Sequence, residues 1–187
     1  LNHTAEHVLD PTILLSPADY RKLIGEEGAE KYTNKITAFI LDRSEDKLAA
    51  LEKVSKVLAM DYNFAATETE DRLAPLEKRI APSVADWLKA MYYADFIFTD
   101  SFHGCVFSIL FNKPFVLYVN RNRGVARFDS LLKLFKIENR TLSDSNELES
   151  CRIRQSIDWK PINAKLEEMR SKSMRFLENA LTAKDEQ

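Results

Sequence analysis

Four consecutive residues, Ser101, Phe102, His103 and Gly104, have the types and the position of an anion-binding turn. They follow a short apolar run and open a second apolar segment at residues 102–112. The first backbone N–H groups of a helix are unpaired and attract an anion, and a glycine lets the anion approach closely. His103 adds a side chain that can donate or accept a proton, so we expect it to be the catalytic residue. In the alternative interpretation, His103 only holds the loop by a hydrogen bond.

An arginine-rich segment follows the next apolar run. Its candidate anion-binding residues are Asn120, Arg121, Arg123 and Arg127. Guanidinium groups suit bidentate binding of a carboxylate or a phosphate. Because consecutive strands usually lie close together, we expect these residues and His103 to face one anionic ligand. In the alternative interpretation they are solvated surface arginines, which contribute little.

Two other patterns do not require a functional explanation. His3, Glu6 and His7 match the H-x-x-E-H pattern of a zinc site, but they stand at the start of the chain, before Pro11, with no helical pattern around them. We therefore expect no metal and no other cofactor. Cys105 has the chemistry of a nucleophile, but it falls within an apolar helical segment, where buried and inert thiols are common.

These residues need strands and helices to position them, and the hydrophobic pattern predicts an alternating order of both. The predicted strands are residues 35–42, 62–67, 95–99 and 114–119. The predicted helices are residues 17–25, 45–60, 83–91, 102–112, 125–137 and 161–183. Residues 1–16 are a lead-in segment, and residues 68–81 are a charged loop. Alternation with short connections predicts an α/β fold, a Rossmann-like, doubly wound parallel sheet with a long C-terminal helix.

Length and composition exclude several classes of protein. The 187 residues fit a single domain, 1–187. With 27 Lys and Arg against 29 Asp and Glu, the net charge is −2, which disfavours nucleic-acid binding. The four glycines lack the spacing of a dinucleotide-binding turn or a P-loop, and no apolar run approaches the roughly 18 residues of a membrane span. The chain has no initiator Met, so we expect it to be part of a longer protein.

Several segments together carry a resemblance to a known family. The block Thr-Asp-Ser-Phe-His-Gly-Cys-Val-Phe-Ser-Ile-Leu-Phe-Asn-Lys-Pro-Phe at residues 99–115, preceded by Ser-Val-Ala-Asp-Trp-Leu at 83–88, resembles the polysaccharide pyruvyl transferase family. Residues 9–16 and 123–128 are similar to that family as well, so the resemblance covers most of residues 9–136. Many members carry Arg-Leu-His where this chain has Ser101-Phe102-His103, so the histidine matches and the arginine does not.

The resemblance implies a transferase that moves the pyruvyl group of phosphoenolpyruvate onto the hydroxyl groups of a cell-surface saccharide acceptor as a ketal. It also implies a GT-B-type fold of which this chain is the C-terminal, donor-binding half, with an N-terminal domain as partner. Such an enzyme would be cytoplasmic and would meet the inner membrane only through its substrate. Two alternatives stay open: half of a GT-B glycosyltransferase that binds a nucleotide sugar, or a non-catalytic carbohydrate-binding module.

Overall fold

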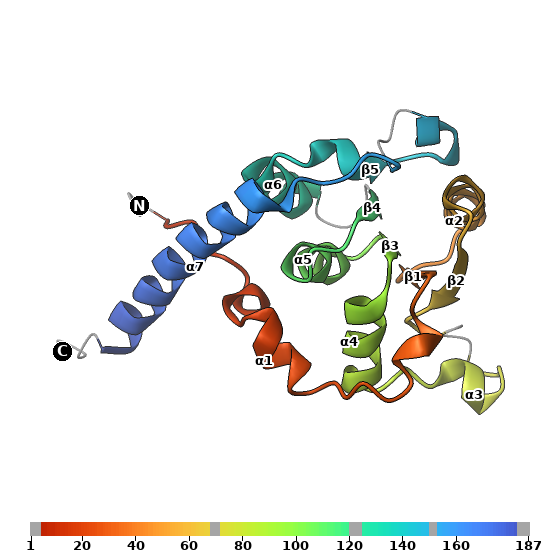
Figure 1. Cartoon of the computed structure of the whole chain (residues 1–187), viewed down its shortest axis with the longest axis horizontal. Helices are drawn as coiled ribbons and strands as arrows, with labels where there is room; N and C mark the ends of the chain where they lie inside the picture. The colour runs from red at the N-terminus through yellow and green to blue at the C-terminus, as the bar shows by residue number, and fades with distance from the viewer. Residues whose placement is uncertain (1–4, 68–71, 120–124, 150–152, 183–187) are drawn as a thin grey trace.

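The computed structural model describes residues 5–67, 72–119, 125–149 and 153–182, and its centre is a five-stranded sheet with the strand order β2-β1-β3-β4-β5 (Figure 1). Every pair of neighbouring strands is parallel, which confirms the predicted α/β fold. The strands are β1 (Lys35–Phe39), β2 (Asp61–Phe64), β3 (Phe96–Thr99), β4 (Phe115–Tyr118) and β5 (Thr141–Leu142).

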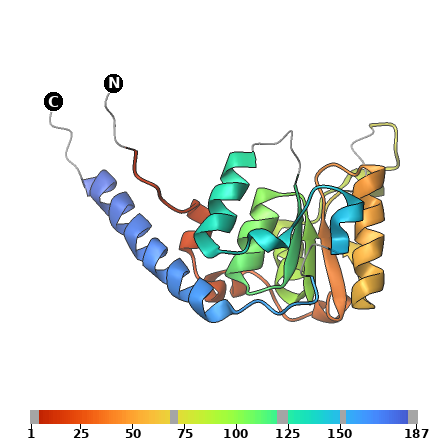
Figure 2. The ribbon, with the colours of Figure 1, turned by 90° about the horizontal axis from the view of Figure 1, so that it is seen from above.

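Helices cover both faces of the sheet, as a doubly wound fold requires. The α-helices are α1 (Pro17–Arg21), α2 (Glu45–Leu58), α3 (Leu76–Arg79), α4 (Val84–Tyr93), α5 (Phe102–Leu110), α6 (Val125–Phe135) and α7 (Trp159–Thr182). Helix α2 packs Ala50, Leu51 and Val54 on one face, and α4, α5, α6 and the first half of α7 pack on the other (Figure 2). Phe98 and Ile97, successive residues of β3, point into these two separate cores.

Local signals explain where the helices begin. Serine residues precede α1, α2 and α4, and the side-chain oxygens of Ser16, Ser44 and Ser83 each accept a backbone N–H from the first turn. Helix α2 ends at a residue with a left-handed backbone, Ala59.

The lead-in segment contributes to the core, which the sequence did not predict. Pro11–Leu14 form the 3₁₀ helix η1, and Ile13 is buried against α5 and α6. The backbone N–H of Leu9 donates to Ser173 Oγ of α7 at 2.9 Å, so the lead-in segment lies against α7 (Figure 1). The described part of residues 1–16 is therefore an integral layer of the fold.

The other differences between the predicted and the observed secondary structure concern short elements. Strand β1 ends at Phe39 where the prediction reached residue 42, and α1 ends at Arg21, four residues before the predicted end. The predicted loop contains α3, and strand β5 was not predicted at all. No described helix is long and apolar enough to cross a membrane.

Candidate functional site

The candidate site lies at the carboxyl end of β3, where the chain turns into α5. A Cβ atom placed on Gly104 would lie 2.2 Å from Thr99 Oγ1 and 2.8 Å from Thr99 Cβ. The missing side chain thus lets α5 begin directly against the end of β3. Thr99 Oγ1 donates to the carbonyl oxygen of Phe39 at 2.7 Å and accepts from the N–H of Ser101 at 3.0 Å, which fixes the turn. Gly104 therefore has a packing role, and its predicted anion contact stays a prediction.

Helix α5 differs from α1, α2 and α4 at its first turn. Ser101 is its N-cap residue, but the Ser101 side chain accepts no backbone N–H. Ser101 is also buried, so the serine itself is held close to the core. The first-turn N–H groups of α5 are thus not capped by Ser101, and their predicted contact with an anion stays a prediction.

His103 is on the exposed side of this first turn. Its side chain is 51% exposed, and its Nε2 atom lies 3.6 Å from Oδ2 of Asp10. This distance exceeds a hydrogen bond but permits electrostatic attraction when the imidazole is protonated. The other oxygen of Asp10 accepts from the N–H and the hydroxyl of Thr12 at 3.0 and 2.6 Å, so the carboxylate is held in place. Asp10 was not predicted as a site residue.

Arg127 lies near the same turn. Its guanidinium carbon is 5.0 Å from the ring centroid of Phe102 and 5.6 Å from that of Phe128. Arg127, Phe102 and Asp10 all line one cavity of about 280 Å³, with Val106 at its wall. The structure thus brings two predicted residues together and adds a carboxylate to them. Such a group can hold an anion beside a histidine.

Three predicted residues, Asn120, Arg121 and Arg123, lie outside the described residues. His3 of the zinc-like pattern also lies outside them, whereas His7 lines the same cavity as Arg127. Among the residues that the structure describes, no group of three or more His, Cys, Asp or Glu side chains could hold a metal ion.

Asp100, just before the α5 turn, connects two strand ends. Its carboxylate accepts from the N–H of Leu41 at 2.8 Å and from Lys47 Nζ at 2.7 Å. Both charged side chains are buried. Asp100 therefore ties β3 to the loop after β1, because two backbone N–H groups at the end of β1 have no strand partner beyond Phe39.

Cys105 does not meet the requirements of a nucleophile. Its side chain is fully buried, and burial raises the pKa of the thiol well above its ordinary value. The predicted inert thiol is thus confirmed.

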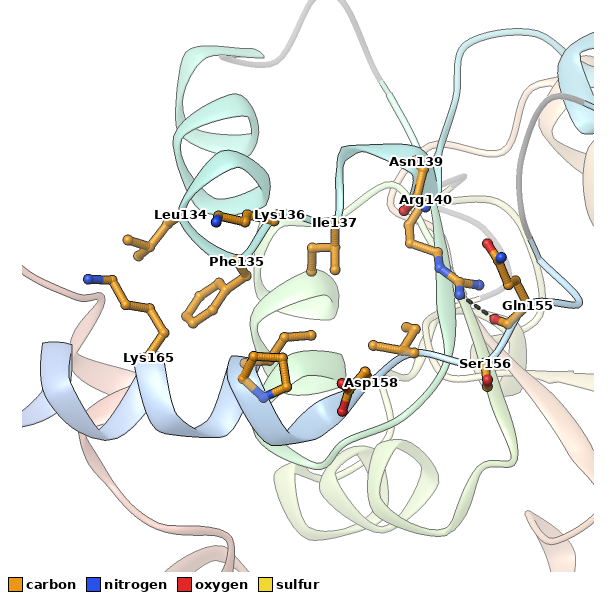
Figure 3. Close-up of a pocket in the computed structure, with 13 residues that line it drawn as sticks. Leu134, Phe135, Lys136, Ile137, Asn139, Arg140, Gln155, Ser156, Asp158 and Lys165 are labelled. Carbon is orange, nitrogen blue, oxygen red and sulfur yellow. Dashed lines mark hydrogen bonds between the residues drawn. The ribbon is translucent and has the colours of Figure 1, made fainter.

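A larger cavity, of about 490 Å³, lies away from this turn (Figure 3). The end of α6, the 3₁₀ helix η3 (Glu138–Arg140) and the start of α7 form its wall. The end of α6 and η3 precede β5, whereas His103 follows the carboxyl end of β3, so the cavity lies toward the amino ends of the strands. Arg140 is buried there and donates to the carbonyl oxygen of Gln155, as Figure 3 shows. This contact joins η3 to the segment that leads into α7.

Together, the parallel strands and the helices on both faces define a Rossmann-like α/β domain, and the uncapped turn of α5 is the candidate ligand site at its carboxyl edge. The model of the polysaccharide pyruvyl transferase family matches residues 1–122, and the chain belongs to this family.

The fold is also similar to a known crystal structure, that of the glycotransferase of kitacinnamycin, with a TM-score of 0.51 and 14% sequence identity. The similarity covers 79% of this chain and 42% of that one, so the chain spans less than half of the length of that protein. At this identity the likeness concerns the fold alone. No curated protein matches the chain significantly.

Proposed function

We propose that this chain is the donor-binding part of a transferase that moves the pyruvyl group of phosphoenolpyruvate onto two hydroxyl groups of a saccharide as a ketal. The observation that carries the proposal is the position of the α5 turn in the family match. The uncapped start of α5 and His103 lie within the matched residues 1–122, and Arg127 lies just after them. Phosphoenolpyruvate carries a phosphate and a carboxylate, and this site offers N–H groups and a guanidinium to both.

The reaction needs a proton donor and anion stabilisation. One proton is added to the methylene carbon of phosphoenolpyruvate, which becomes the methyl group of the ketal. Two hydroxyl oxygens bond to the neighbouring carbon, and the bond from this carbon to the phosphate oxygen breaks. The two acceptor hydroxyls lose two protons in total. One proton is added to the methylene carbon, and the other leaves with the phosphate. In this proposal His103 moves the proton, Asp10 stabilises its cationic form, and the α5 turn holds the anion.

The remaining predicted ligands are part of the proposal as well. Asn120, Arg121 and Arg123 follow β4, the strand next to β3, so they would meet the same ligand. We also propose that a cytoplasmic, two-domain enzyme contains this chain as its C-terminal half. An N-terminal domain would then supply the base for the acceptor hydroxyl, because the proposal assigns Asp10 to His103.

A second candidate is a glycosyltransferase half that binds a nucleotide sugar. The fold likeness to a glycotransferase favours it, because the same helix start suits a diphosphate. The family match favours the pyruvyl donor instead.

Binding measurements separate the two candidates. We expect phosphoenolpyruvate to shift the backbone amide resonances of His103 and Gly104 at lower concentration than a uridine diphosphate sugar does. Arg127→Gln should weaken this binding about five- to 100-fold, because one charge-assisted contact is lost. Arg175→Gln, at an exposed position of α7, is the matched control and should have no effect. Preference for the nucleotide sugar, with no response to phosphoenolpyruvate, would contradict the proposal.

Substitution tests His103 itself. In the full-length protein, ketal formation should be lost in His103→Ala. Unchanged activity would instead indicate a non-catalytic module.

A further inference from the structure

A third cavity, of about 590 Å³, lies between the edge strand β2 and helix α4. Tyr62 and Phe64 of β2 pack on the side of α2, so Asn63, between them, points to the opposite face. There Asn63 lies beside Thr37 of β1, whose hydroxyl donates to a carbonyl oxygen of α4. Asn63 and Trp87 both line this cavity. It is separate from the turn that carries His103.

Several buried polar atoms at or near this cavity lack hydrogen-bond partners. Both side-chain amide atoms of Asn63, the indole nitrogen of Trp87 and the hydroxyl of Tyr93 are buried and have no hydrogen-bond partner among the described residues. Trp87 and Tyr93 belong to one small aromatic cluster with Tyr32, which also lines the cavity. Buried polar groups without partners reduce stability, and native proteins keep few of them. Two of these residues, Asn63 and Trp87, line the same cavity, which indicates a ligand that supplies the missing partners.

The donors, acceptors and rings restrict the chemistry of that ligand. Asn63 offers one acceptor and two donors, and Trp87 offers one donor. Hydroxyl groups on neighbouring carbons of a sugar ring both donate and accept, so they complement the amide, while the C–H face of the ring packs on aromatic side chains. Lys31 and Asp86, which also line the cavity, carry opposite charges, so the cavity has no net preference for an anion.

We propose that this cavity binds one neutral sugar unit of the acceptor polysaccharide, at a distance from the reacting unit. The choice of a polysaccharide rests on the proposed function, in which a polymer extends over several sugar units. Asn63 bonds two adjacent hydroxyls, Trp87 donates to a third oxygen, and the ring packs on Tyr32. Because the Asn63 amide atoms and the Trp87 indole nitrogen have almost no accessible surface, both side chains move toward the cavity when the sugar enters.

Tryptophan provides a direct test, since the chain has two, Trp87 and Trp159, and only the first lines the cavity. The methyl glycosides of glucose, galactose and mannose are titrated into the ¹⁵N-labelled protein. At least one should shift the indole resonance of Trp87 saturably, with a dissociation constant on the order of millimolar, and leave Trp159 unchanged. If no glycoside shifts Trp87 more than Trp159, the proposal is wrong.

Phosphoenolpyruvate, titrated separately, distinguishes this proposal from the proposed function. It reports through the amides of His103 and Gly104, so either site can fail while the other responds. If nucleotide sugars shift Trp87 and neutral glycosides do not, the cavity recognises the nucleotide and the sugar proposal is overturned.

Asn63→Leu tests the role of the amide, because leucine has a similar size and no polar atoms. We expect this variant to fold with a melting temperature at or above that of the wild type and to bind the glycoside at least about tenfold more weakly. Lys165→Met, in the cavity of Figure 3, is the matched control and should not alter glycoside binding. A lower melting temperature together with unchanged glycoside affinity would make Asn63 a structural residue and refute the proposal.

Discussion

Gly104→Ala tests whether the start of α5 is fixed by its contact with β3. The added Cβ would meet Thr99 Oγ1 at 2.2 Å, Cβ at 2.8 Å and Cγ2 at 3.0 Å. None of these atoms can move freely, because Thr99 is fully buried and its hydroxyl bonds both Phe39 and Ser101. Relief of the overlap therefore requires a shift of the helix or the loss of these hydrogen bonds.

The expected change in the free energy of unfolding of Gly104→Ala is the sum of opposing contributions. Overpacking in a core costs about 1–3 kcal/mol, and each hydrogen bond of Thr99 that breaks costs about 0.5–1.5 kcal/mol more. Replacing a helical glycine by alanine stabilises the helix by about 1 kcal/mol, which offsets part of this loss. We expect a net loss of about 2–4 kcal/mol, which lowers the melting temperature of a chain of this size by roughly 4–16 °C. Calorimetry or urea unfolding measures the loss.

The matched control is Gly25→Ala, because an added Cβ at Gly25 meets nothing within 4 Å. This variant should be as stable as the wild type or slightly more stable. Thr99→Ala removes two of the three clashing atoms, so the double variant Thr99→Ala/Gly104→Ala should be less destabilised than the sum of the single variants. Gly104→Ala with the stability of Gly25→Ala would refute the close packing of α5 on β3.

Three further predictions concern charged and buried groups. Asp100→Asn should destabilise the fold by about 1.5–3 kcal/mol in urea unfolding, since it removes one of the two carboxylates that pair with the buried Lys47 and leaves only Asp42. Native Cys105 should react with iodoacetamide only as fast as the protein unfolds, as peptide mass spectrometry can measure, because burial raises the pKa of its thiol. The hydrogen bond from Tyr118 lowers the pKa of Asp46, so this carboxylate stabilises the fold above its ordinary pKa of about 3.9 and loses that effect as the pH falls. The difference in urea midpoint between wild type and Tyr118→Phe should therefore narrow in acid.

The sequence predicted best those elements whose pattern is long. Helix α2 repeats Leu48, Leu51 and Val54 on one face, and its serine cap marks the start, so its bounds were predicted to within two residues. Strand β5 has two residues, Thr141 and Leu142, and no periodicity can be read from two positions. It forms because the backbone N–H and C=O groups at the outer edge of β4 can pair with any extended segment that lies beside them.

The site was predictable where its residues are neighbours in the chain. The turn from Ser101 to Gly104 was recognised because strand, glycine and helix follow one another. The approach of Asp10 to His103 joins residues about 90 positions apart, and it depends on η1 packing between α5 and α7. No local pattern encodes such a contact. The Asp-Pro-Thr segment at residues 10–12 was noticed only as part of the family resemblance.

The topology explains why the site is displaced from the point where such sheets usually bind ligands. The strand order reverses between β1 and β3, and a ligand commonly occupies the crevice outside their carboxyl ends. Here Lys47 and Asp100 fill that position as a buried ion pair, and Asp100 also accepts from the N–H of Leu41. An anion that entered there would compete with a carboxylate already held by three donors. The first turn of α5, which Ser101 does not cap, follows directly after Asp100, and the side chains near this turn are Asp10 of the lead-in segment and Arg127 of α6. The ion pair with Lys47 holds Asp100 in place, and Asp100 is the residue from which the α5 turn begins. The two charges that fill the crevice therefore also position the α5 turn.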